Sequence, residues 1–223
     1  IAMVGSLLLI PNNLPKGAAS TIREQLAVLT KKPLLLVYAK TALGYGGAFT
    51  AFTFLAPILQ QVSGFGAGAV SLILLVYGVS VAFGNIWGGK LADKKGPIAA
   101  LKLIFLGLAG VLLLLSFTAP HPVFAALTVL LWGAVAFGNV PGLQLYVVRQ
   151  AEIYTPKAVD VASGLNIAAF NLGIAFGAWA GGLVVSQFGL MYTPWIGALI
   201  VLLAYGLTHI SGKLDQKLVA QPV

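Results

Sequence analysis

Long runs of apolar residues alternate with short polar gaps along most of this chain. Six of the runs are long enough to cross the hydrocarbon core of a bilayer, which takes about 20 residues of helix. Since six crossings return the chain to the side from which it started, both ends of this unit are expected on one face of the membrane. The predicted membrane-spanning helices are Leu34–Leu59, Gly68–Gly88, Pro97–Phe117, Val123–Val147, Ala158–Val185 and Tyr192–Ile210.

The charged residues indicate which face that is. All 13 Lys and Arg residues lie in, or within a turn or two of, alternate gaps, whereas the gaps at 60–67, 119–122 and 187–191 contain no Lys, Arg, Asp or Glu. Short loops rich in Lys and Arg stay in the cytoplasm. The sequence therefore predicts that both ends of the six-span unit are cytoplasmic.

Composition supports a membrane protein and excludes several other classes. The chain is 59% hydrophobic and 8% charged, whereas a soluble domain carries about 25% charged residues. The net charge of +8 lies on one membrane face, where anionic lipid is the expected partner and nucleic acid is not. The chain has no Cys, and its two histidines are far apart, so we expect no metal site and no cofactor.

The residues outside the six spans divide into three further segments. Residues 1–10 are apolar but too short to cross, so they are predicted to be the end of a truncated transmembrane helix. Residues 11–33 form a cytoplasmic linker, in which Ser20–Leu29 predicts either a short surface helix with a capping-type start or a solvated linker. Residues 34–211 form the six-helix transmembrane unit and 212–223 a cytoplasmic tail.

Four of the spans carry polar side chains, which are costly at membrane depth unless they face a partner or a wet cavity. The third and sixth spans are nearly featureless and are expected to support the other four from the lipid side. The polar residues of the first, second, fourth and fifth spans are Tyr38, Thr41, Tyr45, Tyr77, Ser80, Asn85, Asn139, Gln144, Asn166 and Asn171.

An internal repeat relates the second span to the fifth. A shift of 93 residues lays Val81–Gly89 on Ile174–Gly182 and Gly96 on Gly189. Because three crossings separate the copies, they run in opposite directions through the membrane, which is a 3+3 inverted-topology repeat.

The turn between the second and third spans reads Gly-Lys-Leu-Ala-Asp-Lys-Lys-Gly over residues 89–96. Its glycines permit a tight turn between helices, and its lysines hold the loop at an anionic membrane face. The turn resembles the G-x-L-A-D-[RK]-x-G signature of the major facilitator superfamily. It is a degenerate copy, because Pro97 and Ile98 stand where that family often has further basic residues. The stretch Ser163–Gly177 is similar to the bacterial drug and sugar efflux branch, the arabinose-efflux-type permeases.

This resemblance covers essentially the whole chain and implies an all-α membrane protein, the C-terminal half of a twelve-helix major facilitator fold. It implies a secondary active transporter of the bacterial inner membrane rather than an enzyme. The implied activity is proton-coupled efflux of small organic molecules, drugs or sugars, by alternating access. The implied partners are the small-molecule substrate, the missing N-terminal six-helix half and membrane lipid.

Within that fold, the polar residues near mid-depth are candidates for the substrate cavity. Tyr45 lies about 16 Å into the first span between glycines, which indicates either a broken helix at a binding site or close helix packing. Asn139 indicates either a ligand contact or an interhelical hydrogen bond, while Asn85 and Gln144 are expected to cap or bridge helices. The predicted cavity residues are Tyr45, Asn139, Asn166, Asn171, Tyr77 and Thr41.

The resemblance also gives the turn at 89–96 a role in conformational gating, carried by Gly89, Asp93, Lys94 and Gly96. Asp93 is expected to hold the start of a helix in the other half and so to keep the cytoplasmic side closed in one state. Lys40, the only charge well inside a span, is expected to snorkel to the interface, with a cavity-facing cation as the alternative. No Asp or Glu lies deep in a span, so a proton-coupling carboxylate is expected in the other half.

Other functions are compatible with six spans. An aquaporin-type pore needs two Asn-Pro-Ala turns, whereas Asn139-Val140-Pro141 occurs once. An intramembrane enzyme needs a buried nucleophile, acid or metal set that the sequence lacks. An autonomous six-helix membrane channel or dimerising half-transporter stays open as the alternative.

Overall fold

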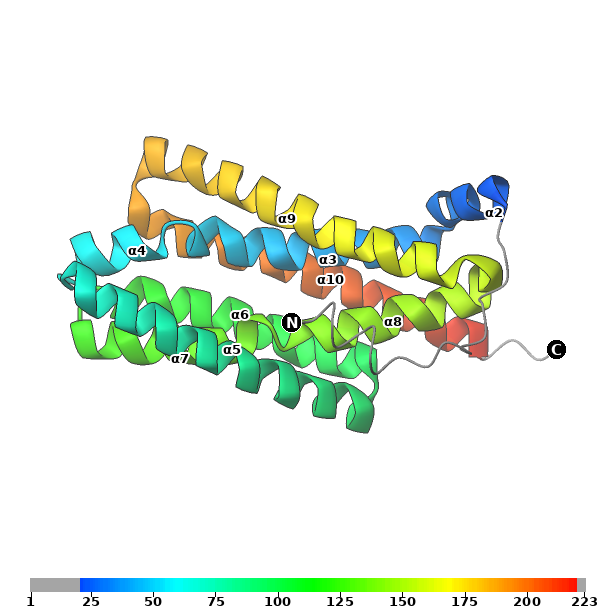
Figure 1. Ribbon diagram of the computed structural model, residues 1–223, viewed down its shortest axis with the longest axis horizontal. Helices are drawn as coiled ribbons and strands as arrows, with labels where there is room; N and C mark the ends of the chain where they lie inside the picture. The colour runs from blue at the N-terminus through cyan, green and yellow to red at the C-terminus, as the bar shows by residue number, and fades with distance from the viewer. Residues whose placement is uncertain (1–20, 220–223) are drawn as a thin grey trace, which may run out of the picture.

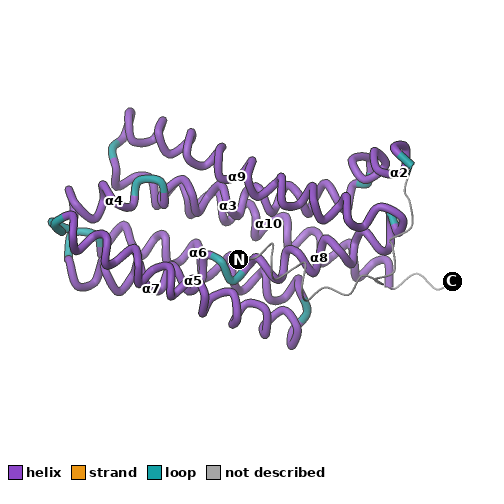
Figure 2. Tube along the Cα trace, viewed as in Figure 1, coloured by secondary structure: helices purple, strands orange, loops and turns teal. Residues whose placement is uncertain are grey.

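The computed structural model of the protein describes residues 21–219, and every element within that range is helical (Figures 1 and 2). The predicted truncated helix at residues 1–10 and residues 11–20 of the predicted linker lie outside the described residues. The elements are α2 (Ile22–Ala27), η1 (Val28–Thr30), α3 (Lys32–Phe52), α4 (Leu55–Pro57), η2 (Ile58–Val62), α5 (Ala67–Lys95), α6 (Pro97–Thr118), α7 (Pro122–Ala136), α8 (Asn139–Tyr154), η3 (Pro156–Ala158), α9 (Val159–Phe188), η4 (Leu190–Tyr192) and α10 (Thr193–Val219).

Six helical segments are long and apolar enough to cross a membrane, as the sequence predicts, and they lie lengthwise beside one another (Figure 1). The all-α membrane fold is therefore confirmed. The segments are Lys32–Val62, Ala67–Lys95, Pro97–Thr118, Pro122–Tyr154, Pro156–Phe188 and Leu190–Gln216.

Two of the spans are interrupted, and in each a proline explains the place. Pro57 has no N–H to donate to the carbonyl of Thr53, where α3 ends, and Pro141 has none to donate to Phe137, where α7 ends. At the second break, Val140 N–H donates to Phe137 O at 3.2 Å, a tighter turn than the α-helical one. The first span does not break at Tyr45, however, because α3 runs without interruption to Phe52.

The glycines around Tyr45 instead allow close helix packing, the second of the two interpretations above. On α9, Gly173, Gly177 and Gly181 face the α3 backbone so closely that a Cβ atom on any of them would lie under 3.0 Å from a carbonyl oxygen of α3. The same arrangement joins α5 to α7 and to the break that follows it, where Gly84 faces the carbonyl of Ala134 and Gly88 faces that of Gly138. Small residues that let two backbones approach are a common means of packing helices in membranes.

The two close-packed helix pairs, α3 with α9 and α5 with α7, are related by the 93-residue repeat. Gly84 and Gly88 correspond to Gly177 and Gly181, and the glycines that end the two repeated helices also correspond. Gly96 after α5 has φ 79° and ψ 156°, and Gly189 after α9 has φ 97° and ψ 169°. Side chains with a Cβ rarely adopt this left-handed conformation, so both turns require glycine.

Two spans show features that the sequence did not indicate. Half of the third span, α6, is buried against neighbouring helices, and its expected supporting role on the lipid side stays a prediction. A run of Leu, Ile and Ala suits a lipid face and a protein core equally well, so composition alone could not distinguish them. The sixth span also continues as α10 through most of the expected tail, since the helix runs to Val219.

The loops that join the spans lie at two ends of the bundle. At one end, Ser63 Oγ donates to Ala119 O at 2.7 Å and joins two uncharged loops. The other end, here called the basic end, carries α2, the α5–α6 turn, the α8–α9 connection and the end of α10 (Figure 1). The Lys and Arg residues of the described spans therefore gather at one end, as the loop pattern predicts.

Candidate functional site

Two of the predicted cavity residues, Tyr45 and Tyr77, are the ends of one chain of aromatic rings. The rings of Phe49 and Phe52 connect them, with centroids 5.2–6.2 Å apart at each step. Phe170 of α9 adds an edge-to-face contact to Tyr45 at 4.4 Å, a favoured geometry for aromatic pairs. Both tyrosines are at most 6% exposed, so in this chain they lie beneath the surface.

Thr41 and Asn166 bond to each other rather than pointing into open space. Thr41 Oγ1 donates to Asn166 Oδ1 at 2.7 Å, and Asn166 Nδ2 donates to Gln144 Oε1 at 3.2 Å. Gln144 continues the chain of hydrogen bonds to Ser163. This polar network joins α3, α8 and α9, so Gln144 bridges helices as expected, and Thr41 and Asn166 contribute to helix association.

Asn139 lies just after the break between α7 and α8 and is 1% exposed. Neither Nδ2 nor Oδ1 of its amide has a hydrogen-bond partner among the described residues. Of the two roles expected for Asn139, the interhelical hydrogen bond is therefore not formed among the described residues. A buried polar group without a partner costs free energy comparable to a lost hydrogen bond, so Asn139 has unused capacity to bind something.

Asn171 is placed differently from the other predicted cavity residues. Its side chain is exposed on α9 and donates to the carbonyl of Ile167 on the same helix at 3.1 Å. Asn85 likewise donates to its own helix, at Val81 O. Asn171 therefore belongs to the outer face of α9.

Lys40 does not snorkel to the interface. It is fully buried, its Nζ lies 3.2 Å from Ser211 Oγ, and it sits 3.7 Å from the ring centroid of Tyr146, a cation–π contact. The Tyr146 hydroxyl in turn donates to Asp215 at 2.9 Å, and Gln150 Nε2 donates to the same carboxylate at 3.1 Å. The sequence did not point to Asp215, because this residue falls in the predicted tail. If the sixth helix continues, however, Asp215 lies four residues after Ser211 and on the same helix face, and that spacing could have indicated its place beside Tyr146.

The gating residues form the α5–α6 turn at the basic end. Asp93 and Lys94 are exposed, and no hydrogen bond or ion pair joins Asp93 to another described residue. Gly96 supplies the left-handed conformation at the turn. A Cβ atom on Gly89 would lie 3.7 Å from Pro141, an ordinary contact. The carboxylate of Asp93 is therefore free to meet a group outside this part of the chain.

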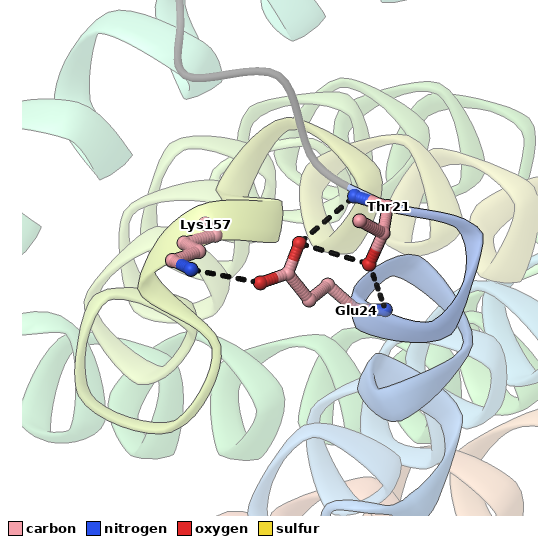
Figure 3. Close-up of polar contacts among 3 residues, drawn as sticks. All are labelled: Thr21, Glu24 and Lys157. Atoms are coloured by element: carbon pink, nitrogen blue, oxygen red, sulfur yellow. Dashed lines mark hydrogen bonds and ion pairs between the residues drawn. The ribbon is translucent and has the colours of Figure 1, made fainter.

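Helix α2 docks on the connection between α8 and α9 at the same end (Figure 3). Thr21 and Glu24 form a capping box, and Glu24 accepts from Lys157 Nζ at 2.9 Å. The backbone hydrogen bond from Thr21, followed by the contact with Lys157, lowers the pKa of Glu24 to about 2. Val28, just after α2, is fully buried beside α3 and α8. The predicted short helix is therefore correct, and the solvated-linker alternative is wrong for these residues.

No group of three or more His, Asp or Glu side chains within residues 21–219 is arranged to hold a metal ion. The residues described above offer hydrogen-bonding and aromatic groups to a ligand. They contain no nucleophile paired with a base.

Comparison with known proteins identifies the family. The sequence profile of the Major Facilitator Superfamily matches residues 1–152. The chain is 50% identical over 217 residues to the "Uncharacterized MFS-type transporter YtbD" of Bacillus subtilis (strain 168), covering 97% of this chain and 54% of that protein. It is 38% identical over 205 residues to the "Inner membrane transport protein YdhP" of Escherichia coli (strain K12), covering 90% and 51%.

A third relative is the "Probable sugar efflux transporter" of Helicobacter acinonychis (strain Sheeba), 34% identical over 208 residues, which are 92% of this chain and 51% of that protein. The chain thus spans about half the length of the curated relatives it matches. Both the profile and the relatives describe transporters, not enzymes. With its six-span inverted repeat and its match to the family profile over most of its length, the chain belongs to the major facilitator superfamily.

Proposed function

We propose that this chain is the C-terminal half of a secondary active transporter that works by alternating access. The observation that carries the proposal is the exposure of α5 and α9, the two least buried of the six spans. They lie on opposite sides of the bundle (Figure 1), and both bear exposed large apolar side chains such as Phe83 and Trp179. A second six-helix half, for which the roughly doubled length of the relatives leaves room, would cover such faces.

The proposed substrate is a small organic molecule, drug or sugar, that the transporter exports. The aromatic chain from Tyr45 to Tyr77 would stack on apolar or sugar rings. The unpaired amide of Asn139 is buried within this half, and it would exchange hydrogen bonds with a polar substituent when the helices around the break between α7 and α8 shift to open it. Asn171 would contribute from the outer face of α9, and Thr41 with Asn166 would hold α3 and α9 in register beside the site.

Gating is assigned to the α5–α6 turn. Asp93, which has no partner among the described residues, would accept hydrogen bonds from a helix N-terminus of the other half, because a carboxylate is stabilised there by the unpaired N–H groups and the helix dipole. Lys94 would hold the turn at the anionic membrane face. Gly89 and Gly96 would allow the turn to form at close helix approach.

Proton coupling is proposed to depend on the other half. The acidic residues of this sequence all lie at or near the basic end: Glu24, Asp93, Glu152, Asp160 and Asp215. A coupling carboxylate at mid-membrane depth therefore has to come from elsewhere in the protein. The proposed location is the bacterial inner membrane with the basic end in the cytoplasm. The Escherichia coli relative, an "Inner membrane transport protein", supports the membrane, and the Lys and Arg residues at the basic end support the orientation.

Transport by the full-length protein in inverted membrane vesicles tests the proposal. Panels of labelled sugars and cationic dyes should accumulate when a proton gradient is imposed, and a protonophore should abolish the accumulation. Accumulation that is unaffected by the protonophore would contradict proton coupling.

A second experiment separates the half-transporter from an autonomous or dimerising six-helix protein. Residues 21–219 would be expressed alone and together with the preceding part of the full-length protein. The proposal expects activity only when both parts are present and co-purify one to one. Transport by the six-helix part alone, or its purification as a dimer, would favour the alternative.

A further inference from the structure

A groove of about 550 Å³ opens at the basic end between the start of α6 and the ends of α8 and α10. None of the proposed substrate residues lines it. Its walls come from residues at the ends of three spans, near Pro97, Ile153 and Gln216. A groove at this position lies at the level of the lipid headgroups if the spans cross a bilayer.

The charge of the groove favours an anion. Lys95, Lys102 and Arg149 line it, and Asp215 is the only acidic residue that does. Within the described part of the chain, none of the three cations forms an ion pair. Both oxygens of Asp215 already accept hydrogen bonds, from Tyr146 and Gln150. The positive charge of the groove is therefore not balanced by its own residues.

A second, independent feature is the side chain of Gln150, which lines the groove and is 3% exposed. Its Nε2 donates to Asp215, but its Oε1 is buried without a donor among the described residues. A fully deprotonated anion such as sulfate supplies no hydrogen to such an oxygen. A ligand that carries hydroxyl groups beside its anionic group supplies one.

We infer that this groove binds the headgroup of an anionic phospholipid of the cytoplasmic leaflet whose phosphate is esterified to a hydroxyl-bearing group, as in phosphatidylglycerol. The phosphate faces Lys102 and Arg149, with Lys95 at the edge of the groove, and the headgroup hydroxyls lie toward Gln150. The exposed apolar side chain of Ile153 borders the groove at its outer edge, one turn nearer the end of α8 than Arg149. Since binding is measured without substrate, the inference stands or falls independently of the proposed transport activity.

The test measures lipid binding to the delipidated full-length protein in detergent, by native mass spectrometry and by the shift of Tm on adding lipid. Phosphatidylglycerol should bind and raise Tm, while phosphatidylcholine should do neither. Arg149→Gln and Lys102→Gln should each raise the Kd for phosphatidylglycerol about fivefold, as expected for one basic residue beside an anionic headgroup. Lys213→Gln is the matched control, because Lys213 is exposed on α10 at the same end and does not line the groove.

Ala99→Phe fills the groove without changing its charge, because Ala99 lines it at the start of α6. This variant should lose phosphatidylglycerol binding although every cation is retained. Should it fail to fold, the two charge variants at the groove still decide the outcome. The inference is overturned if Lys213→Gln weakens binding as much as Arg149→Gln does, or if phosphatidylcholine binds equally well. Equal stabilisation by inorganic phosphate or glycerol phosphate overturns the lipid assignment in favour of a free anion.

Discussion

Replacing Gly177 by alanine should separate α9 from α3. A Cβ atom at Gly177 would lie 3.0 Å from both the Cα and the carbonyl carbon of Gly46, and closer still to its oxygen. These are backbone atoms that cannot rotate away, so the two helices must move apart along a contact that also includes Gly173 and Gly181. Overpacking of this kind costs about 1–3 kcal/mol, and a rigid obstacle favours the upper end. Alanine is more favourable than glycine in a helix by about 1 kcal/mol, so the free energy of unfolding should fall by about 2 kcal/mol in total.

Gly182 provides a matched control on the same helix, since a Cβ atom there meets nothing within 4 Å. Gly182→Ala should be neutral or more stable by up to about 1 kcal/mol, so the two variants should differ by about 3 kcal/mol. That difference corresponds to a Tm gap of about 6–12 °C for a unit of 150–250 residues. Thermal unfolding of the purified protein, followed by fluorescence-detected size-exclusion chromatography, measures it. Equal Tm values for the two variants would refute the close-packing argument.

Three further predictions follow from the polar contacts. The pKa of Glu24 is lowered from 4.5 to about 2. Its contribution to the docking of α2 is therefore complete above pH 4.5 and is lost as the pH falls through about 2. Hydrogen exchange at the Val28 amide should show this loss in the native protein, whereas the Glu24→Gln variant should show no such pH dependence. Thr41→Val removes the hydrogen bond to Asn166 and should cost about 1 kcal/mol; a double-mutant cycle with Asn166→Leu that gives no coupling would contradict the network. Asp93→Asn should slow transport without weakening substrate binding, and unchanged turnover would rule out its gating role.

The sequence predicted the membrane spans more completely than it predicted the candidate site. Polarity at membrane depth drew attention to Asn166, but it could not show that Thr41 and Gln144 would satisfy its amide. Asn139 has the same chemistry, yet its amide has no such partner. The difference depends on which helices meet at each residue, and a single sequence does not contain that information.

The hydrophobic pattern by itself determined the six spans, because a bilayer requires about 20 apolar residues for each crossing. The spacing of glycines determined the inverted repeat and the conformation of its two turns, since only glycine readily adopts the left-handed geometry of Gly96 and Gly189. The tertiary structure alone decided that half of α6 is buried while α5 and α9 are largely exposed, because leucine-rich surfaces pack equally well on lipid and on protein. It also decided that Lys40 turns inward to Tyr146 and Ser211, since a buried cation depends on partners that come from distant helices.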